Sequence, residues 1–400
     1  MIADIYLMYM RVSIWPLVLL LWSCSKTDPK SQAPAYPAVE AAFGSNIDLT
    51  RLVDYAGQPK PAYIVKDNAR GFVISNARAT LGRVLFYDKN LSVTNSVSCA
   101  SCHKQAFAFG DTAVLSSGVE NGLTNRHSMR LVNVRFATEQ KFFWNERAAN
   151  LEAQVTQPIE DHAEMGFSGQ NGRPGFSTLL SKLQGIGYYK ELFRFVYGDE
   201  QVTQARIQEG LTHFVRSIQS FDSKYDVGRA SAPNDQVPFA NFSALENQGK
   251  QLYQAPPVFD AGGNRINGGL GCNGCHNAPE FDISPNSGNN GVIGVANGNG
   301  IDVGNTRAPS LRDLVRSDGT LNGPMMHTGF FTSLQQVIGH YGTINIAPGN
   351  MAALDPRLRP GGVGQKLQLT AIEVNAVQAF LRTLAGEKLY TDVRWSNPFR

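Results

Sequence analysis

The sequence carries little charge and no cluster of basic residues. Only 17% of its 400 residues are charged, and the formal net charge is +3. Proteins that bind nucleic acid need concentrated positive charge. The composition therefore excludes a nucleic-acid partner. A hydrophobic content of 42% together with 39 glycines and 20 prolines is typical of a globular chain with long loops.

The sequence also lacks a hydrophobic run long enough to cross a bilayer. The apolar run from Ile14 to Trp22 is too short for a membrane span but has the length of a signal-peptide core. Residues 1–9 contain Asp4 and no basic residue, so Met10-Arg11 fits the start of such a signal better. We therefore expect an exported protein.

Cysteine is scarce, and its five positions are informative. Leu21-Trp22-Ser23-Cys24 resembles the lipobox of bacterial lipoproteins, although a Trp in the middle is unusual. We expect residues 1–24 to be a lipoprotein-type signal peptide, a lipid on Cys24 to anchor the protein to a membrane, and the protein to lie in the periplasm. Cleavage or anchoring of another kind is the alternative. Residues 25–60 then read as a tether, with a packed arm as the alternative from Leu49 onwards.

The other four cysteines form two signatures of the kind that attaches c-type haem. Ser98-Cys99-Ala100-Ser101-Cys102-His103 is followed much later by Gly271-Cys272-Asn273-Gly274-Cys275-His276. On one helical turn, two cysteines three residues apart face the same side and each forms a thioether, while the histidine binds the iron. A zinc site, a redox dithiol and a disulfide are the alternatives, but none requires a histidine after both pairs. The sequence therefore predicts two covalently bound haem c groups.

Helical periodicity dominates the rest of the chain, and no long strand-like alternation competes with it. We expect helices over residues 81–88 and 178–184, a helix after a Thr203 cap, a helix after a Ser243–Glu246 capping box, and a last helix from Thr370 to Gly386. The helix after Thr203 carries an apolar stripe: Ile207, Leu211, Phe214, Ile218 and Phe221. His213 lies off this stripe, so we expect it on the surface.

The organisation predicted from these elements is a mainly α protein of two cytochrome-like domains, each with one haem. The run Gly228-Arg-Ala-Ser-Ala-Pro-Asn-Asp-Gln-Val-Pro238, between Asp226 and Phe242, marks the boundary. We expect an N-terminal haem domain over 61–230 and a C-terminal one over 240–390. Residues 283–305 suit neither helix nor strand, so we expect a long ordered loop over the second haem or at the surface that faces the electron donor, with a disordered segment as the alternative.

The chain resembles the bacterial di-haem cytochrome c peroxidase family, which includes MauG-type enzymes. The resemblance runs from about Asn76 to Leu384. The motifs that carry it are the two haem signatures together with Leu81-Gly-Arg-Val-Leu-Phe-Tyr-Asp88, Phe143-Trp-Asn-Glu-Arg-Ala148, Glu164-Met-Gly166 and Ala308-Pro-Ser-Leu-Arg312. It implies a peroxide site at the His103 haem and a site where electrons enter at the His276 haem.

The resemblance also implies three catalytic residues. Trp144 corresponds to the tryptophan between the haems, Glu164 to the catalytic glutamate, and Gln154 to a residue of the same pocket. A carboxylate suits this place because cleaving the O–O bond requires a proton to move from one peroxide oxygen to the other. An apolar pocket raises the pKa of a glutamate toward neutrality, which lets it hold that proton. The alternative is a core aromatic and a surface acid.

The sixth iron ligands are less clear. In many members a histidine after the first signature closes the peroxide iron, but this chain has Val119 at that place, so we expect an open first haem. For the second haem, Tyr341 matches the distal ligand, and Met325, Met326 and His340 are alternatives. Tyrosine is typical of MauG-type enzymes and methionine of standard peroxidases. We assign no role to His162 or His327.

A calcium ion between the domains is a further family feature. The family's Asn ligand is His127 here, a poor ligand for a cation that prefers oxygen, and the other ligands are backbone carbonyls near Arg307 to Pro309. Calcium is therefore left open. The expected function is reduction of hydrogen peroxide to water with electrons from a small exported c-type cytochrome or cupredoxin. A MauG-type oxidase acting on a partner protein and a non-enzymatic electron carrier are the rivals, and a homodimer is open because members are often dimers.

Overall fold

The computed structural model describes residues 35–307 and 309–400 and is mainly helical, as predicted. The predicted signal peptide and Cys24 lie outside the described residues. Within those residues no helix has both the length and the apolar character needed to cross a membrane. The helices are α1 (Pro37–Phe43), α2 (Asn76–Tyr87), α3 (Cys99–Cys102), α4 (Leu151–Gln154), α5 (Gln157–Glu160), α6 (Phe176–Gln184), α7 (Gly187–Tyr197), α8 (Gln204–Ser217), α9 (Lys224–Ala230), α10 (Ala244–Gln254), α11 (Leu334–Gly342) and α12 (Ala371–Arg382).

Strands are few and short in the described part of the chain. They form two antiparallel pairs, β1 (Pro257–Phe259) with β2 (Arg265–Gly268) and β3 (His276–Asn277) with β4 (Asp282–Ile283). No helix or strand is assigned between β4 and α11 in the described residues, which agrees with the long loop expected over residues 283–305. The loop is ordered, since isolated bridges such as Gly294–Ile301 pair it locally.

Two helix pairs form the centres of two hydrophobic clusters. In the first cluster α2 crosses α8, and a Cβ on Gly82 would lie 1.9 Å from the carbonyl oxygen of Gly210. In the second cluster α10 crosses α12, and a Cβ on Gly249 would lie 1.9 Å from the carbonyl oxygen of Ala376. Glycine is required at both crossings because any side chain would push the helices apart. The same packing solution therefore occurs once beside each haem signature.

The predicted capping residues begin their helices as expected. Thr203 Oγ1 accepts from the N–H of Arg206 at 3.2 Å, and Ser243 and Thr370 form capping boxes with Glu246 and Glu373. The long helix ends earlier than its apolar stripe suggested. α8 stops at Ser217, so Ile218 and Phe221 lie beyond its end, and α12 stops at Arg382.

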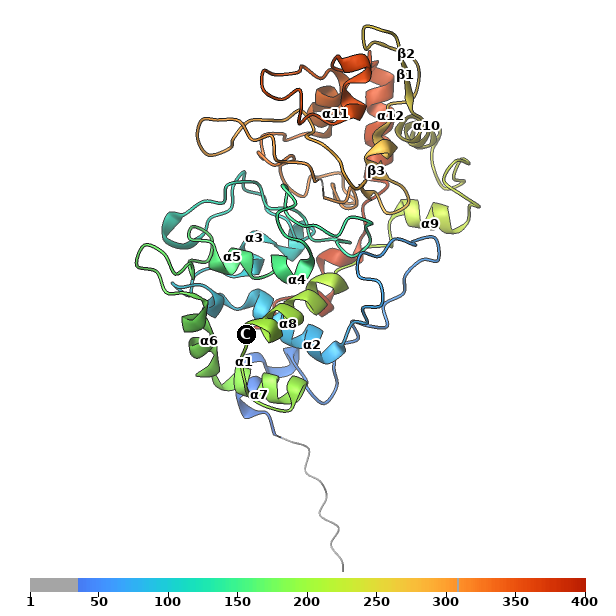
Figure 1. Cartoon of the computed structure of the whole chain (residues 1–400). Helices are drawn as coiled ribbons and strands as arrows, with labels where there is room; N and C mark the ends of the chain where they lie inside the picture. The colour runs from blue at the N-terminus through green and yellow to red at the C-terminus, as the bar shows by residue number, and fades with distance from the viewer. Residues whose placement is uncertain (1–34, 308) are drawn as a thin grey trace, which may run out of the picture. The chain divides into compact units, whose positions relative to one another are not determined.

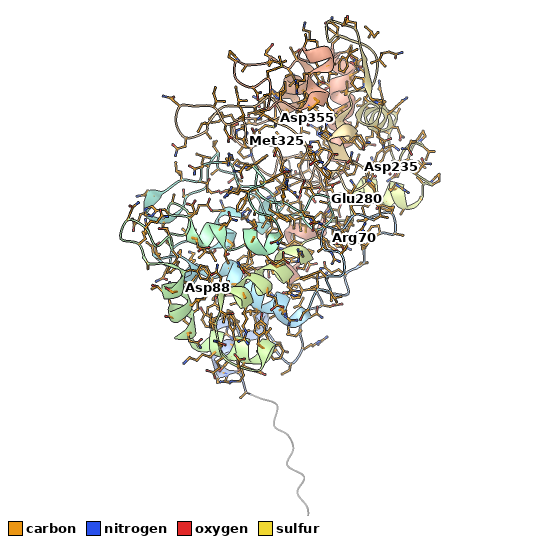
Figure 2. The ribbon with its side chains drawn as sticks, viewed as in Figure 1. Arg70, Asp88, Asp235, Glu280, Met325 and Asp355 are labelled. Carbon is orange, nitrogen blue, oxygen red and sulfur yellow. The ribbon has the colours of Figure 1, made fainter. Side chains whose placement is uncertain are left out.

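Two predictions about the first half were wrong. His213 is only 3% exposed, because its Nδ1 accepts the backbone N–H of Ser75 at 3.0 Å and its ring packs on Phe72. The tether prediction fails from Pro37 onwards, because α1 buries Val39 and Phe43 in the first cluster. Figure 1 shows α1 beside α7, and Figure 2 labels Asp88, which accepts the hydroxyls of two tyrosines of α7.

Candidate functional site: two cavities and the wall between them

Each haem signature lines its own cavity. The first cavity, of about 400 Å³, contains Cys99, Cys102 and His103, and the second, of about 600 Å³, contains Cys272, Cys275 and His276. Cys99 and Cys102 lie at the two ends of α3, one helical turn, as predicted. The second signature instead forms a 3₁₀ turn over Cys272–Gly274. Both turns direct the thiols and the following histidine toward one space of the size that ligand pockets have.

The histidines of both signatures are prepared to bind a metal ion as neutral rings. His103 Nδ1 lies 3.0 Å from the carbonyl oxygen of Phe109, which makes Nδ1 the protonated nitrogen of the neutral ring and leaves Nε2 without a proton. Burial lowers the pKa of His103. Burial, followed by the charges of Arg357 and Arg130, lowers the pKa of His276 to about 4, and its Nδ1 is buried without a partner. A neutral imidazole with an unpaired nitrogen fits an iron ligand.

The four thiols are also buried. Burial raises the pKa of Cys99 and Cys272 to about 12, and that of Cys102 and Cys275 to about 11. Reactive dithiols have lowered pKa values, so a redox pair is disfavoured. Within the described residues the cysteines are unpaired, and no three His, Cys, Asp or Glu side chains come together as a metal site. The zinc and disulfide alternatives are therefore not supported, and the residues present fit covalently bound haem c.

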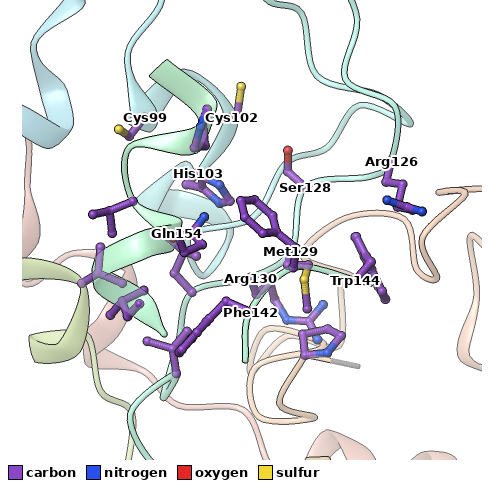
Figure 3. A pocket seen from close by; sticks show the side chains of 18 of the residues that line it. Cys99, Cys102, His103, Arg126, Ser128, Met129, Arg130, Phe142, Trp144 and Gln154 are labelled. Atoms are coloured by element: carbon purple, nitrogen blue, oxygen red, sulfur yellow. The ribbon is translucent and has the colours of Figure 1, made fainter. Parts of the chain in front are cut away.

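Glu164 and Gln154 both line the first cavity, together with the haem signature. Burial is the main cause that raises the pKa of Glu164 to about 7, the nearby charge of Asp161 adds to it, and Arg147 opposes it. Asp161 is fixed in place because its Oδ1 accepts the backbone N–H groups of Ala163 and Glu164 at 2.9 and 3.1 Å. The cavity therefore holds a carboxyl group that exchanges a proton near neutral pH. Gln154 is the last residue of α4 and adds an amide to the same space (Figure 3).

The loop that contains Val119 packs against the backbone of Glu164. The backbone N–H of Val119 donates to the carbonyl oxygen of Glu164 at 3.0 Å, and a Cβ on Gly118 would lie 1.9 Å from the carbonyl oxygen of Ala163. Val119 is buried and does not line the first cavity. This loop contributes Thr124 and Asn125 to the lining of the first cavity, so the residues it contributes include no histidine that could bind the iron. The glycines flanking Val119 were a signal for this close approach that the sequence analysis did not use.

Seven residues line both cavities and form the wall between them, which we call the partition: His127, Ser128, Met129, Arg130, Trp144, Arg307 and Pro309. Trp144 is 8% exposed, and its Nε1 donates to the carbonyl oxygen of His127 at 2.7 Å. Its own carbonyl oxygen accepts the N–H groups of Thr306 and Arg307 at 2.8 and 3.0 Å. Trp144 is thus fastened to the segments that separate the cavities. Sequence reasoning did not identify Ser128, Met129 and Arg130, which no motif marks.

The candidate ligands of the second haem divide into two groups. Tyr341, Met325 and Met326 line the second cavity, whereas His340 does not and has its Nε2 2.9 Å from the carbonyl oxygen of Asn290. The amide of Asn290 lies 3.3 Å from Met326 Sδ and 3.5 Å from Tyr341 Oη. Figure 2 labels Met325 in the half that contains this cavity. Burial raises the pKa of Tyr341 well above its usual value.

The remaining histidines have structural contacts. His127 is buried with Nδ1 near the carbonyl oxygens of Ala113 and Val114, at 3.0 and 3.1 Å. His327 contacts Asn305 at 2.7 Å through Nδ1, and its ring lies edge-on to Trp144. His162 contacts Ser168 at 3.0 Å. The ring of His127 is therefore already bonded to backbone carbonyl oxygens.

Two haem-attachment cavities that share an indole define a di-haem c-type redox protein. Residues 76–231 match the family described as "Di-haem cytochrome c peroxidase". The methylamine utilization protein MauG of Methylophilus methylotrophus is 28% identical over 320 residues, 78% of this chain and 83% of that protein. Cytochrome c551 peroxidase of Nitrosomonas europaea is 25% identical over 326 residues, 78% of this chain and 80% of its own.

A solved structure supports the same assignment. The crystal structure of a MauG-like protein associated with microbial copper homeostasis matches with a TM-score of 0.66 and 26% identity, over 86% of this chain and 99% of that one. Residues 76–231 are therefore a domain that matches the di-haem cytochrome c peroxidase family, and MauG and the cytochrome c peroxidases are both among the proteins that the chain is similar to. This similarity, together with the two signatures, implies two c-type haems.

Proposed function

We propose that the protein reduces hydrogen peroxide to water in the first cavity, with electrons that enter one at a time through the second. The observation that carries this proposal is the half-buried Glu164 in the cavity of Cys99, Cys102 and His103, with its pKa raised to about 7. When bound there, haem supplies the iron that binds peroxide and accepts the electrons. The balance is one peroxide, two electrons and two protons to two waters.

Glu164 handles the proton in this proposal. Its carboxylate takes the proton from one peroxide oxygen and returns it to the other, so that water is the leaving group. Gln154 orients the peroxide or the carboxyl group by hydrogen bonding. Trp144 lies between the cavities and shortens the distance that each electron crosses. The donor is a small exported c-type cytochrome or a cupredoxin, and the protein is periplasmic, with a lipid on Cys24 as its anchor.

The proposal is tested by steady-state peroxide consumption with a reduced small c-type cytochrome. Glu164→Gln keeps the shape of the side chain but removes its proton exchange, so we expect two haems and a rate lowered by about 10²- to 10⁴-fold. Glu160→Gln changes an exposed carboxylate at the end of α5 and is the matched control. Unchanged turnover in Glu164→Gln would remove this residue from the mechanism.

A second candidate function is oxidation of side chains on a partner protein by hydrogen peroxide, which takes up their electrons and protons and is reduced to water, as in a MauG-type enzyme. The observation that favours it is Tyr341 in the lining of the second cavity. A tyrosinate ligand lowers the reduction potential of an iron relative to a thioether and suits high oxidation states. Tyr341→Phe and Met326→Leu distinguish the two, because only the variant that removes the ligand changes the absorption spectrum of the second haem. A change confined to Met326→Leu supports the peroxidase.

A further inference from the structure

Arg130 is a buried cation in the partition without a matching acid. Its side chain lines both cavities, and the residue is 9% exposed. One nitrogen, Nη2, donates to the carbonyl oxygen of Ser310 at 3.0 Å, and Nε is buried with no partner. Within residues 35–307 and 309–400 no carboxylate oxygen lies within 4.0 Å of its nitrogens. A buried guanidinium in this state is expensive unless an anion binds it.

The residues around Arg130 leave space for its side chain but give its charge little compensation. A Cβ on Gly110 would lie 2.9 Å from Arg130 Cγ, so this glycine makes room for the arginine stem. Burial lowers the pKa of Arg130 to about 10, which shows how little the protein compensates its charge. The acid that acts on it is Asp313, whose Oδ1 accepts the N–H of Gly386 at 2.8 Å and the hydroxyl of Tyr390 at 3.1 Å and which forms no ion pair with Arg130.

Arg307, the other arginine of the partition, differs from Arg130 in the number of acids that act on its charge. It is also buried, and it donates to the carbonyl oxygen of Lys141. Burial lowers the pKa of Arg307 too, but three acids, Glu139, Glu146 and Asp282, oppose this effect, whereas a single acid does so at Arg130. The two arginines of the partition are therefore not equivalent. Arg130 is the one whose charge the protein leaves for a ligand.

The position of Arg130 matches the chemistry of haem. Each haem carries two propionate carboxylates, and a planar guanidinium binds carboxylates through paired hydrogen bonds. Figure 3 shows Arg130 next to Met129 in the pocket lined by the first haem signature. Its charge also acts on His276 in the second cavity. One side chain thus has access to the surroundings of both haems.

We propose that Arg130 binds the propionate carboxylates of the haems on both sides of the partition and serves as their shared fixed cation. The proposal rests on the two haems of the proposed function but not on peroxide turnover. A positive charge beside a haem favours the reduced form, which carries one positive charge less. Arg130 therefore raises the reduction potentials of both haems together.

Spectroelectrochemical titration of the purified di-haem protein tests this proposal. In Arg130→Met we expect both midpoint potentials to become more negative, by roughly a tenfold change in the ferrous-to-ferric ratio, which is about 59 mV for one electron. Arg130→Lys keeps the charge and restores most of the shift. Arg83→Met is the matched control, because Arg83 is 3% exposed, donates to Ser396 and lines neither cavity. We expect Arg83→Met to be less stable but to keep the midpoint potentials of both haems unchanged.

A second readout covers the case in which Arg130→Met does not accumulate. Arg130→Lys replaces the planar fork by a point charge, so the resonance Raman propionate bending bands of both haems should shift relative to the unmodified protein. Unchanged potentials in Arg130→Met, or unchanged bands in Arg130→Lys, overturn the proposal. Neither readout uses peroxide, so a failure of the peroxidase function with both haems present leaves this test intact. A purified protein that contains no haem would overturn both the peroxidase proposal and the Arg130 proposal.

Discussion

The backbone N–H of Val119 donates to the carbonyl oxygen of Glu164 at 3.0 Å. The loop that lacks a histidine ligand is therefore the loop that holds the cavity acid in place. It contacts Glu164 through the backbone, and the residues that it contributes to the lining of the first cavity, Thr124 and Asn125, include no histidine. Three glycines of this region, Gly118, Gly122 and Gly166, lie close to neighbouring groups, which keeps the loop and the acid together.

The first prediction concerns the resting state. Because Val119 occupies the place of the closing histidine and is turned away from the cavity, we expect the oxidised first haem to be high-spin and to bind peroxide before any electron is supplied. Electron paramagnetic resonance of the oxidised protein and a stopped-flow peroxide titration measure both. A low-spin bis-histidine signal from the first haem would contradict this prediction.

The second prediction concerns pH. The proposed step begins with the ionised carboxylate of Glu164, and burial raises its pKa to about 7. We therefore expect kcat/KM for peroxide to rise as the pH increases through about 7. Asp161→Asn keeps the oxygen that accepts the two backbone N–H groups but removes the second cause of the raised pKa, so the rise should move to lower pH. A pH profile unchanged in this variant would count against the assignment.

The third prediction concerns electron transfer through the partition. Trp144→Phe removes the indole and its hydrogen bond to the carbonyl oxygen of His127, at a cost of about 0.5–1.5 kcal/mol in stability. We expect slower oxidation of the second haem by peroxide but unchanged peroxide binding at the first, both measured by stopped-flow absorption. Trp395→Phe is the control, because Trp395 is also buried and bonded, to Ser217 Oγ at 3.1 Å, and lines neither cavity.

The fourth prediction concerns stability and His213. Burial lowers the pKa of His213 to about 4, below its usual 6.5, so the unfolded chain takes up a proton before the folded one. Stability is therefore complete above pH 6.5 and falls as the pH decreases toward 4. We expect a smaller fall in His213→Gln, which keeps an acceptor for the N–H of Ser75. Thermal unfolding of both proteins from pH 4 to 7 measures the difference, and parallel curves would refute this assignment.

The fifth prediction concerns calcium. The ring of His127 is already bonded to two carbonyl oxygens, and Arg130 supplies a positive charge to the partition. We therefore expect chelation of calcium to leave the haem spectra and peroxide turnover unchanged. Spectra before and after treatment with a chelator and gel filtration measure this. A loss of activity that added calcium restores would show that a calcium ion is needed.

The sequence predicted the parts of this protein that repeat a local rule. The two signatures, the caps at Thr203, Ser243 and Thr370, and the mainly helical fold follow from short-range spacing, and the structure confirms them. The place of Trp144, Gln154 and Glu164 in the cavity lining followed from resemblance rather than from spacing, because residues from different elements meet there.

The features that could not be predicted from the sequence depend on contacts between residues far apart in the chain. His213 lies off the apolar stripe of α8, yet α2 packs against that face and its Ser75 cap needs an acceptor. α1 has seven residues, too few for its periodicity to distinguish it from a linker. It is fixed by the burial of Val39 and Phe43 and by Glu191, which accepts the N–H groups of Ala38 and Val39 at 3.1 and 2.9 Å. Arg130 has no motif, and its significance is visible only once both cavities are formed.

The last residues of the chain complete the hydrophobic cluster of the first half. Leu389 and Trp395 belong to that cluster, and Gln105, close to His103, donates to the carbonyl oxygens of Leu389 and Asp392 at 3.0 and 2.9 Å. Figure 1 places the C-terminus among α1, α2 and α8. The half that contains Cys99 and Cys102 therefore depends on residues far downstream of both cysteines, and its hydrophobic cluster is not complete before residues 389–395 have been synthesised and packed.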